Sequence, residues 1–105
     1  DDMWAGWCAK TICDQLGYGV KTGVPYIRHE KASKWQSNFR KEQNGILWQE
    51  EIIPFFEDVS LSSSSAINCY YELADEVEEN LTEIDEYFDE LSNGMRIWAN
   101  LWEDK

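Results

Sequence analysis

A stripe of apolar residues through the last third of the chain constrains its fold more than any other feature. The stripe alternates steps of three and four residues, and its members are Ile67, Tyr70, Ala74, Val77, Leu81, Ile84, Phe88, Leu91, Met95, Trp98 and Trp102. This spacing is typical of one face of a helix. Two structures fit it: one long helix in a coiled coil, or a hairpin broken near residues 82–85, where Thr82 would cap the second helix. We favour the hairpin.

Charge divides the 105-residue chain into two unlike parts. Residues 1–45 hold five acids and seven bases, whereas residues 46–105 hold sixteen acids and two bases, and the net charge is −12. The acidic part would repel phosphates, which excludes a nucleic-acid surface there. Hydrophobic residues make up 43 % of the chain, which indicates a folded core rather than disorder. No apolar run approaches the roughly 20 residues of a membrane-spanning helix.

A first helix is predicted near the start of the sequence. Apolar residues recur there at every fourth position, at Trp4, Cys8, Ile12 and Leu16. Asp2 can cap this helix, and Gly17 can adopt the left-handed conformation that ends it. Residues 18–27 contain glycines and a proline among β-branched residues, so they predict one or two short extended β segments around a turn.

Two further helices are expected before the apolar stripe. Ser33 would cap the first, and Asn44-Gly45 would end it. The second would run on to Phe56 and would stop or kink at Pro54, because proline lacks a backbone N–H. The predicted fold is therefore mainly α with short β segments.

The stretch DDMWAGW at residues 1–7 contains the first candidate site. Asp1 and Asp2 lie where a helix is expected to begin, and an aspartate there commonly acts as a cap. A carboxylate at the edge of a pocket can instead act as a base or accept a hydrogen bond from a sugar hydroxyl. Trp4 and Trp7 have the spacing of core residues, although either indole could stack on a sugar ring.

His29, the only histidine, lies among basic residues. A lone histidine is more often structural, because a metal site needs several converging ligands. If His29 binds a metal, its other ligands lie outside this chain. The neighbouring cations form either a solvated basic rim or a set of charges that faces a diphosphate. These cations are Lys21, Arg28, Lys31 and Lys34.

Other catalytic signals are missing from the sequence. Cys8, Cys13 and Cys69 are odd in number and form no CxxC pair, so we expect free and mostly buried thiols. We find no phosphate loop, GxGxxG, HExxH, nucleophile elbow or zinc-finger spacing. The residues alone therefore argue against catalysis by this chain in isolation.

Four blocks of sequence nevertheless occur in a recognisable order. They are DDMWAGWC, GVKTGVPYI, the pattern HxKAS in HEKAS, and WQEEIIPFF. Together they resemble the C-terminal part of the plant reversibly glycosylated polypeptides, also called UDP-arabinopyranose mutases. The similarity is dense up to Phe56 and looser from Val59 onward. It implies that the chain is a C-terminal fragment of a longer polypeptide whose earlier part carries the nucleotide-binding half.

The resemblance implies a fold and a set of site residues. Residues 1–58 would complete an α/β catalytic domain of the A-type glycosyltransferase (GT-A-like) fold, and residues 59–105 would form an acidic helical tail. Asp1 and Asp2 would be the acidic catalytic groups, and His29 would be a ligand of a divalent metal, Mn or Mg, with most other ligands outside this chain. The substrate would contact Trp4, Trp7, Lys21 and Lys31.

The implied activity is the interconversion of UDP-arabinopyranose and UDP-arabinofuranose, with reversible self-glycosylation, in plant cell-wall synthesis. The resemblance also implies homo- or hetero-oligomers with related subunits, in the cytosol and at the cytosolic face of the Golgi. This chain alone would be inactive. A second interpretation stays open, in which the chain is a non-catalytic acidic helical module that serves binding and assembly.

Overall fold

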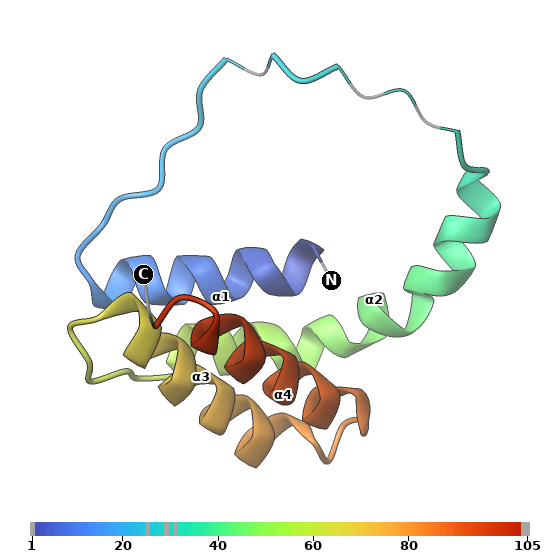
Figure 1. Cartoon of the computed structure of the whole chain (residues 1–105). Coiled ribbons are helices and arrows are strands. Elements are labelled where there is room, and N and C mark those ends of the chain that lie inside the picture. Colours follow the sequence, from blue (N-terminus) through green and yellow to red (C-terminus); the bar gives the residue numbers. More distant parts are fainter. Residues whose placement is uncertain (1, 25, 29, 31, 104–105) are drawn as a thin grey trace.

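The computed structural model describes residues 2–24, 26–28, 30 and 32–103, and this part of the chain is helical without strands. The helices are α1 (Asp2–Gln15), α2 (Trp35–Asp58), α3 (Ala66–Leu81) and α4 (Tyr87–Asn100). Figure 1 shows α1, α3, α4 and the second half of α2 packed together, while the first half of α2 projects away. None of these helices is long and apolar enough to cross a membrane, as far as the described residues go.

The apolar stripe folds back on itself, which confirms the predicted hairpin. α3 and α4 pack along their length, and both helices direct their stripe residues into the shared core. The buried members of the stripe are Ala74, Val77, Leu81, Phe88 and Met95. The C-terminal end of the stripe lies outside the core, since Trp98 there is about half exposed. In the hairpin, most stripe residues are buried or partly buried within one chain. Their burial therefore needs no coiled-coil partner.

The turn between α3 and α4 uses different caps from those expected. Thr82 does not cap α4, because it lies at the C-terminal end of α3 and its hydroxyl donates to the Glu78 carbonyl at 2.9 Å. The N-cap position of α4 is Glu86, whose side chain makes no capping bond, and the carboxylate of the preceding Asp85 accepts the backbone N–H of Tyr87 at 2.9 Å. At the other end of the hairpin, the Ser65 hydroxyl accepts the N–H of Asn68 and caps α3.

Helix α1 confirms the first predicted helix. Gly17 has φ of +74°, and the N–H of Tyr18 bonds the Cys13 carbonyl at 2.8 Å. This is the arrangement in which a left-handed glycine closes a helix by satisfying carbonyls of its last turn.

Helix α2 replaces the two short helices expected in its place. Asn44-Gly45 does not end a helix, because Gly45 lies inside α2 where this helix meets the Trp4 ring. A Cβ at position 45 would lie 3.4 Å from that ring, so the glycine allows the close approach. Pro54 does not stop the helix either: it cannot donate to the Glu50 carbonyl, yet α2 continues to Asp58, and Ile52 and Phe56 are buried on either side of the proline.

The start of α2 also differs from the expectation. The N-cap position is Lys34, whose side chain makes no capping bond, so Ser33 is not the cap. The Ser33 hydroxyl instead accepts a hydrogen bond from the Asn38 side chain at 2.9 Å.

Residues 18–34, which we call the arm, connect α1 to α2 along an extended path. The short β segments predicted at residues 18–27 are wrong for the described residues, because none of them belongs to a strand. A strand requires a neighbouring strand to accept its backbone hydrogen bonds, and the described part of the chain offers no sheet. Figure 1 shows the arm arching away from the helices.

One hydrophobic core joins all four helices. It draws buried side chains from residues on both sides of position 58, including Trp4, Cys8, Ile52, Leu73 and Phe88. Cys8 and Cys69 are buried, Cys13 is partly buried, and all three are free thiols, as predicted.

The hairpin predicts that stripe positions differ in their effect on stability. Phe88→Ala removes a side chain that is 1 % exposed, so we expect it to lower the free energy of unfolding by about 3–5 kcal/mol. Trp98→Ala removes a half-exposed ring and should lower the free energy of unfolding far less. Urea denaturation followed by circular dichroism measures both values. Equal losses at the two positions would contradict the hairpin and favour a single long helix.

Substitutions of Gly45 should change stability in opposite directions for a small and a large side chain. Gly45→Ala adds one carbon at ordinary contact distance from Trp4, so helix propensity should raise stability by up to about 1 kcal/mol. Gly45→Leu extends the side chain into the indole and should lower stability. Gly94, also within a helix, is the control, because a Cβ there meets nothing within 4 Å. Thermal unfolding that ranks Gly45→Leu with Gly94→Leu would contradict the close α1–α2 contact.

Candidate functional site

Several predicted site residues lie outside the described part of the chain. These are Asp1, His29, Lys31 and the side chain of Asp2, so their roles stay predictions. The backbone of Asp2 begins α1, which places that residue at the positive end of the helix dipole.

The two predicted stacking residues are both engaged in packing. Trp4 is 4 % exposed, and its ring centroid lies 6.4 Å from that of Phe88. Trp7 is half-buried and lies parallel to Phe56, with the ring centroids 6.0 Å apart. Phe56 therefore occupies one face of the Trp7 indole, and a sugar could stack only on the other face.

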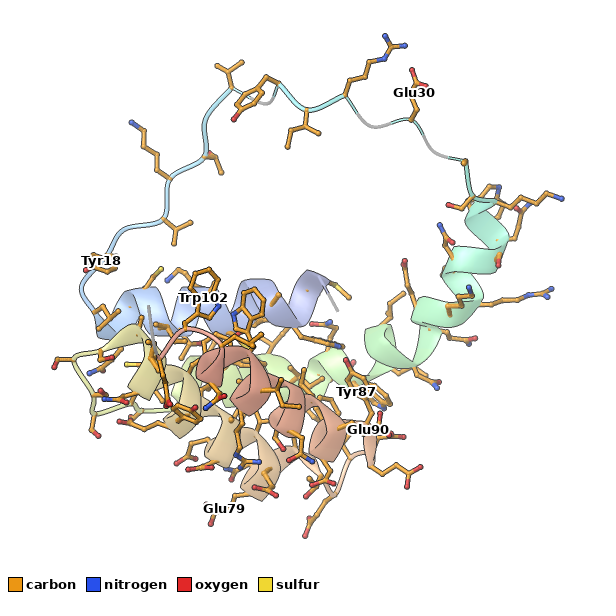
Figure 2. The ribbon with its side chains drawn as sticks, viewed as in Figure 1. Tyr18, Glu30, Glu79, Tyr87, Glu90 and Trp102 are labelled. Carbon is orange, nitrogen blue, oxygen red and sulfur yellow. The ribbon has the colours of Figure 1, made fainter. Side chains whose placement is uncertain are left out.

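The predicted basic contacts belong to the arm and not to α1, which carries the two indoles. Lys21 is exposed in the arm, and Arg28 pairs with Glu30 at 2.9 Å on its surface. Figure 2 shows Tyr18 at the beginning of the arm and Glu30 near its end, with the extended segment between them.

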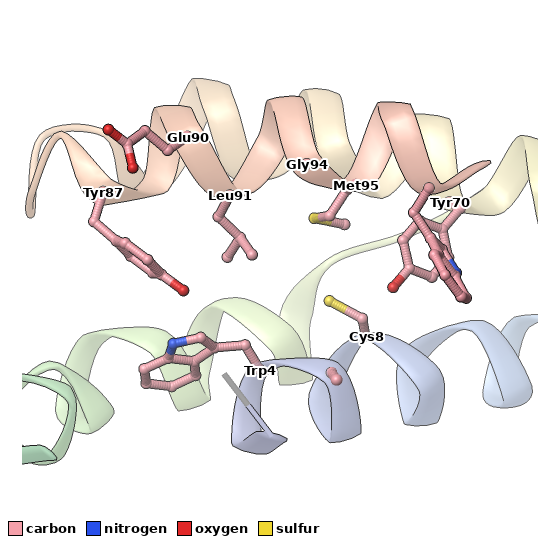
Figure 3. A pocket seen from close by; sticks show the side chains of 10 residues that line it. Trp4, Cys8, Tyr70, Tyr87, Glu90, Leu91, Gly94 and Met95 are labelled. Carbon is pink, nitrogen blue, oxygen red and sulfur yellow. The ribbon is translucent and has the colours of Figure 1, made fainter. Parts of the chain in front are cut away.

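A first cavity of about 380 Å³, the α1–α4 cavity, opens between α1 and α4. Figure 3 shows the hydroxyl of Tyr87 above the Trp4 indole, and Met95 facing Cys8. Burial raises the pKa of the Cys8 thiol to about 11, so this thiol is protonated and a poor nucleophile at neutral pH. Burial also raises the pKa of Tyr87, and a hydrogen bond with Trp4 offsets part of that rise. The cavity is thus largely apolar, with a protonated thiol and protonated hydroxyl groups, and Glu90 also lines it.

A second cavity of about 500 Å³, the α1–α2 cavity, lies beside the first turn of α1. Met3 and Trp4 form one wall, and α2 forms the other with Asn38, Lys41 and Asn44. Amide and ammonium groups of this kind can bind sugar hydroxyls and phosphate oxygens. Met3 and Trp4 place this cavity beside the start of α1, and Glu42 adds a carboxylate to its α2 wall.

The sequence prediction missed the α2 wall of this cavity. Asn38, Lys41, Gly45 and Trp48 follow steps of three and four residues, which is the signal of a single helix face. The predicted break at Asn44-Gly45 divided that face between two helices. A continuous helix would have placed all four residues together.

The described residues do not form a metal centre by themselves. No group of three or more His, Cys, Asp or Glu side chains converges among them. The predicted metal role of His29, with ligands mostly outside this chain, is not tested by this part of the structure.

Comparison with known proteins identifies the family. The model of the reversibly glycosylated polypeptide family matches residues 1–105. The chain is 56 % identical to probable UDP-arabinopyranose mutase 1 of Pisum sativum and to UDP-arabinopyranose mutase 3 of Arabidopsis thaliana, and 50 % identical to UDP-arabinopyranose mutase 1 of Oryza sativa subsp. japonica. No solved structure matches the chain.

Each of these alignments covers 99 % of the chain and 29 % of the relative. The chain therefore spans less than a third of the length of the curated relatives, and it matches their C-terminal part. The family model and the relatives agree over the whole chain, as the four sequence blocks predicted. This chain belongs to the reversibly glycosylated polypeptide family.

Proposed function

We propose that the chain is the C-terminal part of a UDP-arabinopyranose mutase, which interconverts the pyranose and furanose forms of UDP-arabinose. The observation that carries this proposal is the alignment of 99 % of the chain, at 49–56 % identity, with relatives that bear this name. The described helices hold no complete nucleotide site, so the rest of the active site belongs to the part of the relatives that this chain does not span.

In this proposal the α1–α2 cavity receives the sugar end of the substrate. Asp1 and Asp2 act at its edge as acidic groups, and Trp4 forms its apolar wall. We add Asn38 and Lys41 to the predicted substrate contacts, because both line this cavity. The remaining predicted contacts come from Trp7, Lys21 and Lys31.

The finer family properties belong to the same proposal. A GT-A-like domain would take its sheet from the part outside this chain, and the helices described above would pack beside it. A divalent metal, Mn or Mg, would have His29 as a late ligand. Reversible self-glycosylation, oligomers with related subunits and a place at the cytosolic face of the Golgi are proposed on the family resemblance.

A second candidate function is a binding module without catalysis. The observation that favours it is the exposure of apolar side chains at the end of α4, where Ile97 and Leu101 are 66 % and 59 % exposed. Most of the stripe is buried or partly buried in the hairpin, so assembly would use the exposed apolar residues at this C-terminal end, where the stripe residues Trp98 and Trp102 are 52 % and 48 % exposed. A native protein that associates but neither binds UDP nor converts UDP-arabinopyranose would favour the module.

Removal of either acidic group tests the enzymatic proposal. In the native polypeptide we expect Asp1→Asn or Asp2→Asn to lower kcat by about 100-fold or more, because a positioned acid or base contributes at least this much. Chromatographic measurement of UDP-arabinofuranose formed from UDP-arabinopyranose gives the rate. Asp14→Asn is the control, since Asp14 is an exposed aspartate on the same helix, paired with Lys10 at 2.5 Å.

The assay tests the role of the acidic pair and the mutase activity separately. Wild-type turnover by both asparagine variants would remove the role of the acidic pair. Absence of turnover in the unaltered native protein would overturn the mutase proposal itself.

The metal role of His29 predicts a change in metal dependence. We expect His29→Ala to raise the Mn²⁺ concentration for half-maximal activity by about 10-fold or more, because loss of groups that support a metal has effects of this size. Titration of activity with Mn²⁺ measures it, with Lys10→Ala at an exposed position of α1 as the control. An unchanged Mn²⁺ dependence would discard His29 as a ligand.

A further inference from the structure

We propose that the α1–α4 cavity is a binding site for a small organic cation of the quaternary ammonium class. The proposed function assigns the sugar end of its substrate to the other cavity, and the two cavities share only the wall that Trp4 and Tyr87 form. The proposal concerns binding and does not rest on the mutase activity.

Aromatic rings lie at both ends of the α1–α4 cavity. Figure 3 shows Trp4 and Tyr87 at one end and Tyr70 at the other, with Met95 between them. Trp98 is a fourth aromatic residue in the lining. The face of such a ring attracts a cation through the ring quadrupole, and tryptophan gives the strongest attraction. The walls therefore offer a cation more than an aliphatic surface would.

Two of these rings are held in place by other aromatic side chains. The Trp4 ring centroid lies 6.4 Å from that of Phe88, and the Trp98 ring meets that of Trp102 edge to face at 5.7 Å. Rings that are already packed lose little conformational freedom when a ligand binds, so the cost of ordering the site is small.

The charge of the lining decides the sign of the ligand. Among the described residues that line the cavity, Glu90 is the one with a charged side chain. It lies at the Tyr87 end of the cavity (Figure 3) and belongs, with Asp89, to the acidic first turn of α4. A carboxylate there attracts a positive ligand and repels the phosphates of a nucleotide. The site therefore favours a cation and disfavours a nucleotide sugar.

The shortage of acceptors in the lining favours an alkylated ammonium over a primary one. A primary ammonium has three N–H donors, and each needs an acceptor when the group leaves water. The strong acceptors among the lining side chains are the Glu90 carboxylate and the phenol oxygens of Tyr70 and Tyr87. A quaternary ammonium has no N–H, so its methyl groups can pack against the rings and Met95 while its charge faces Glu90.

Small residues keep room for such a ligand between the helices. Ala5 of α1 and Gly94 of α4 both line the cavity, and a Cβ at position 94 would meet nothing within 4 Å. The volume of about 380 Å³ lies within the range of roughly 300–1,000 Å³ that is typical of small-molecule sites. The cavity can therefore hold a single free molecule with a trimethylammonium group.

Calorimetric titration of the native polypeptide, as purified from its source, tests the proposal. The probes are choline and dimethylbutanol, its neutral isostere, in which a carbon replaces the charged nitrogen. We expect choline to bind about 10-fold more tightly, because only the cation gains from the aromatic faces and the carboxylate. Equal affinities would overturn the proposal.

Two further results would identify a different occupant. Absence of saturable choline binding would overturn the proposal and would indicate that another part of the native polypeptide covers the cavity. Binding of the protein to phosphatidylcholine vesicles without saturable binding of free choline would also overturn it, because the ligand would then be a lipid surface.

A pair of charge-neutralising variants locates the cation. Glu90→Gln should weaken choline binding by about 5-fold, because it removes the carboxylate that lines the cavity. Asp89→Asn is the matched control, since Asp89 is an exposed acid of the same turn outside the lining. Both variants change the net charge equally, so equal losses would assign the effect to the general negative field and overturn the site.

A pair of glycine variants tests the cavity itself. Gly94→Leu places a side chain in the space for the ligand and should weaken choline binding by at least about 10-fold. Gly6→Leu is the control, because Gly6 does not line the cavity and a Cβ there also meets nothing within 4 Å. Circular dichroism reports whether each variant is folded. Wild-type affinity in a folded Gly94→Leu protein would overturn the proposal.

These binding measurements are independent of turnover. Selective choline binding by a protein without mutase activity would leave the cation site standing and overturn the proposed function. Mutase activity in a protein that binds both probes equally would do the reverse.

Discussion

The packing of Phe88 against two indoles holds the helices together. Its ring centroid lies 5.3 Å from that of Trp48 and 6.4 Å from that of Trp4, so one side chain of α4 contacts α1 and α2 at once. Tyr87 extends this cluster, since its ring stacks on Trp48 at 5.9 Å. The hairpin turn places Phe88 at the start of α4, and without that turn the three helices would have no common centre.

The acidic surface of the hairpin follows from the same arrangement. Because the stripe is buried, the acids between its members point outward into water, where their repulsion is screened. Arg96 of α4 reduces the repulsion among these acids. Its guanidinium pairs with two acidic residues of α3, with Asp75 at 2.7 Å and also with Glu78. These pairs raise the pKa of Arg96 further, so the bridge keeps its positive charge.

The two cavities differ in what their walls can do. In the α1–α4 cavity, burial raises the pKa of the Cys8 thiol and of the Tyr87 phenol, so both hold their protons at neutral pH. The α1–α2 cavity combines an indole with amide and ammonium groups beside the end of α1. Glu42 also lines the second cavity, and this cavity is the one that the proposed function assigns to the sugar end of the substrate.

The sequence by itself determined the features that depend on local spacing. The three-and-four stripe predicted a helical tail and fitted both a hairpin, which we favoured, and one long helix. The four-residue recurrence from Trp4 predicted α1, and Gly17 predicted its end. The four ordered blocks, from DDMWAGWC to WQEEIIPFF, predicted the family, whose model matches residues 1–105.

Only the tertiary structure decided the features that depend on contacts between distant residues. Gly45 was predicted to end a helix, yet it lies within α2, where a Cβ would be 3.4 Å from the Trp4 ring, so there is room for a small side chain only. Pro54 stays within α2 because Ile52 and Phe56 are buried around it. Residues 18–27 have the composition of strands and form none among the described residues, because a strand exists only where a second strand accepts its hydrogen bonds. Local spacing could not reveal these outcomes, since each depends on a partner that lies elsewhere in the fold.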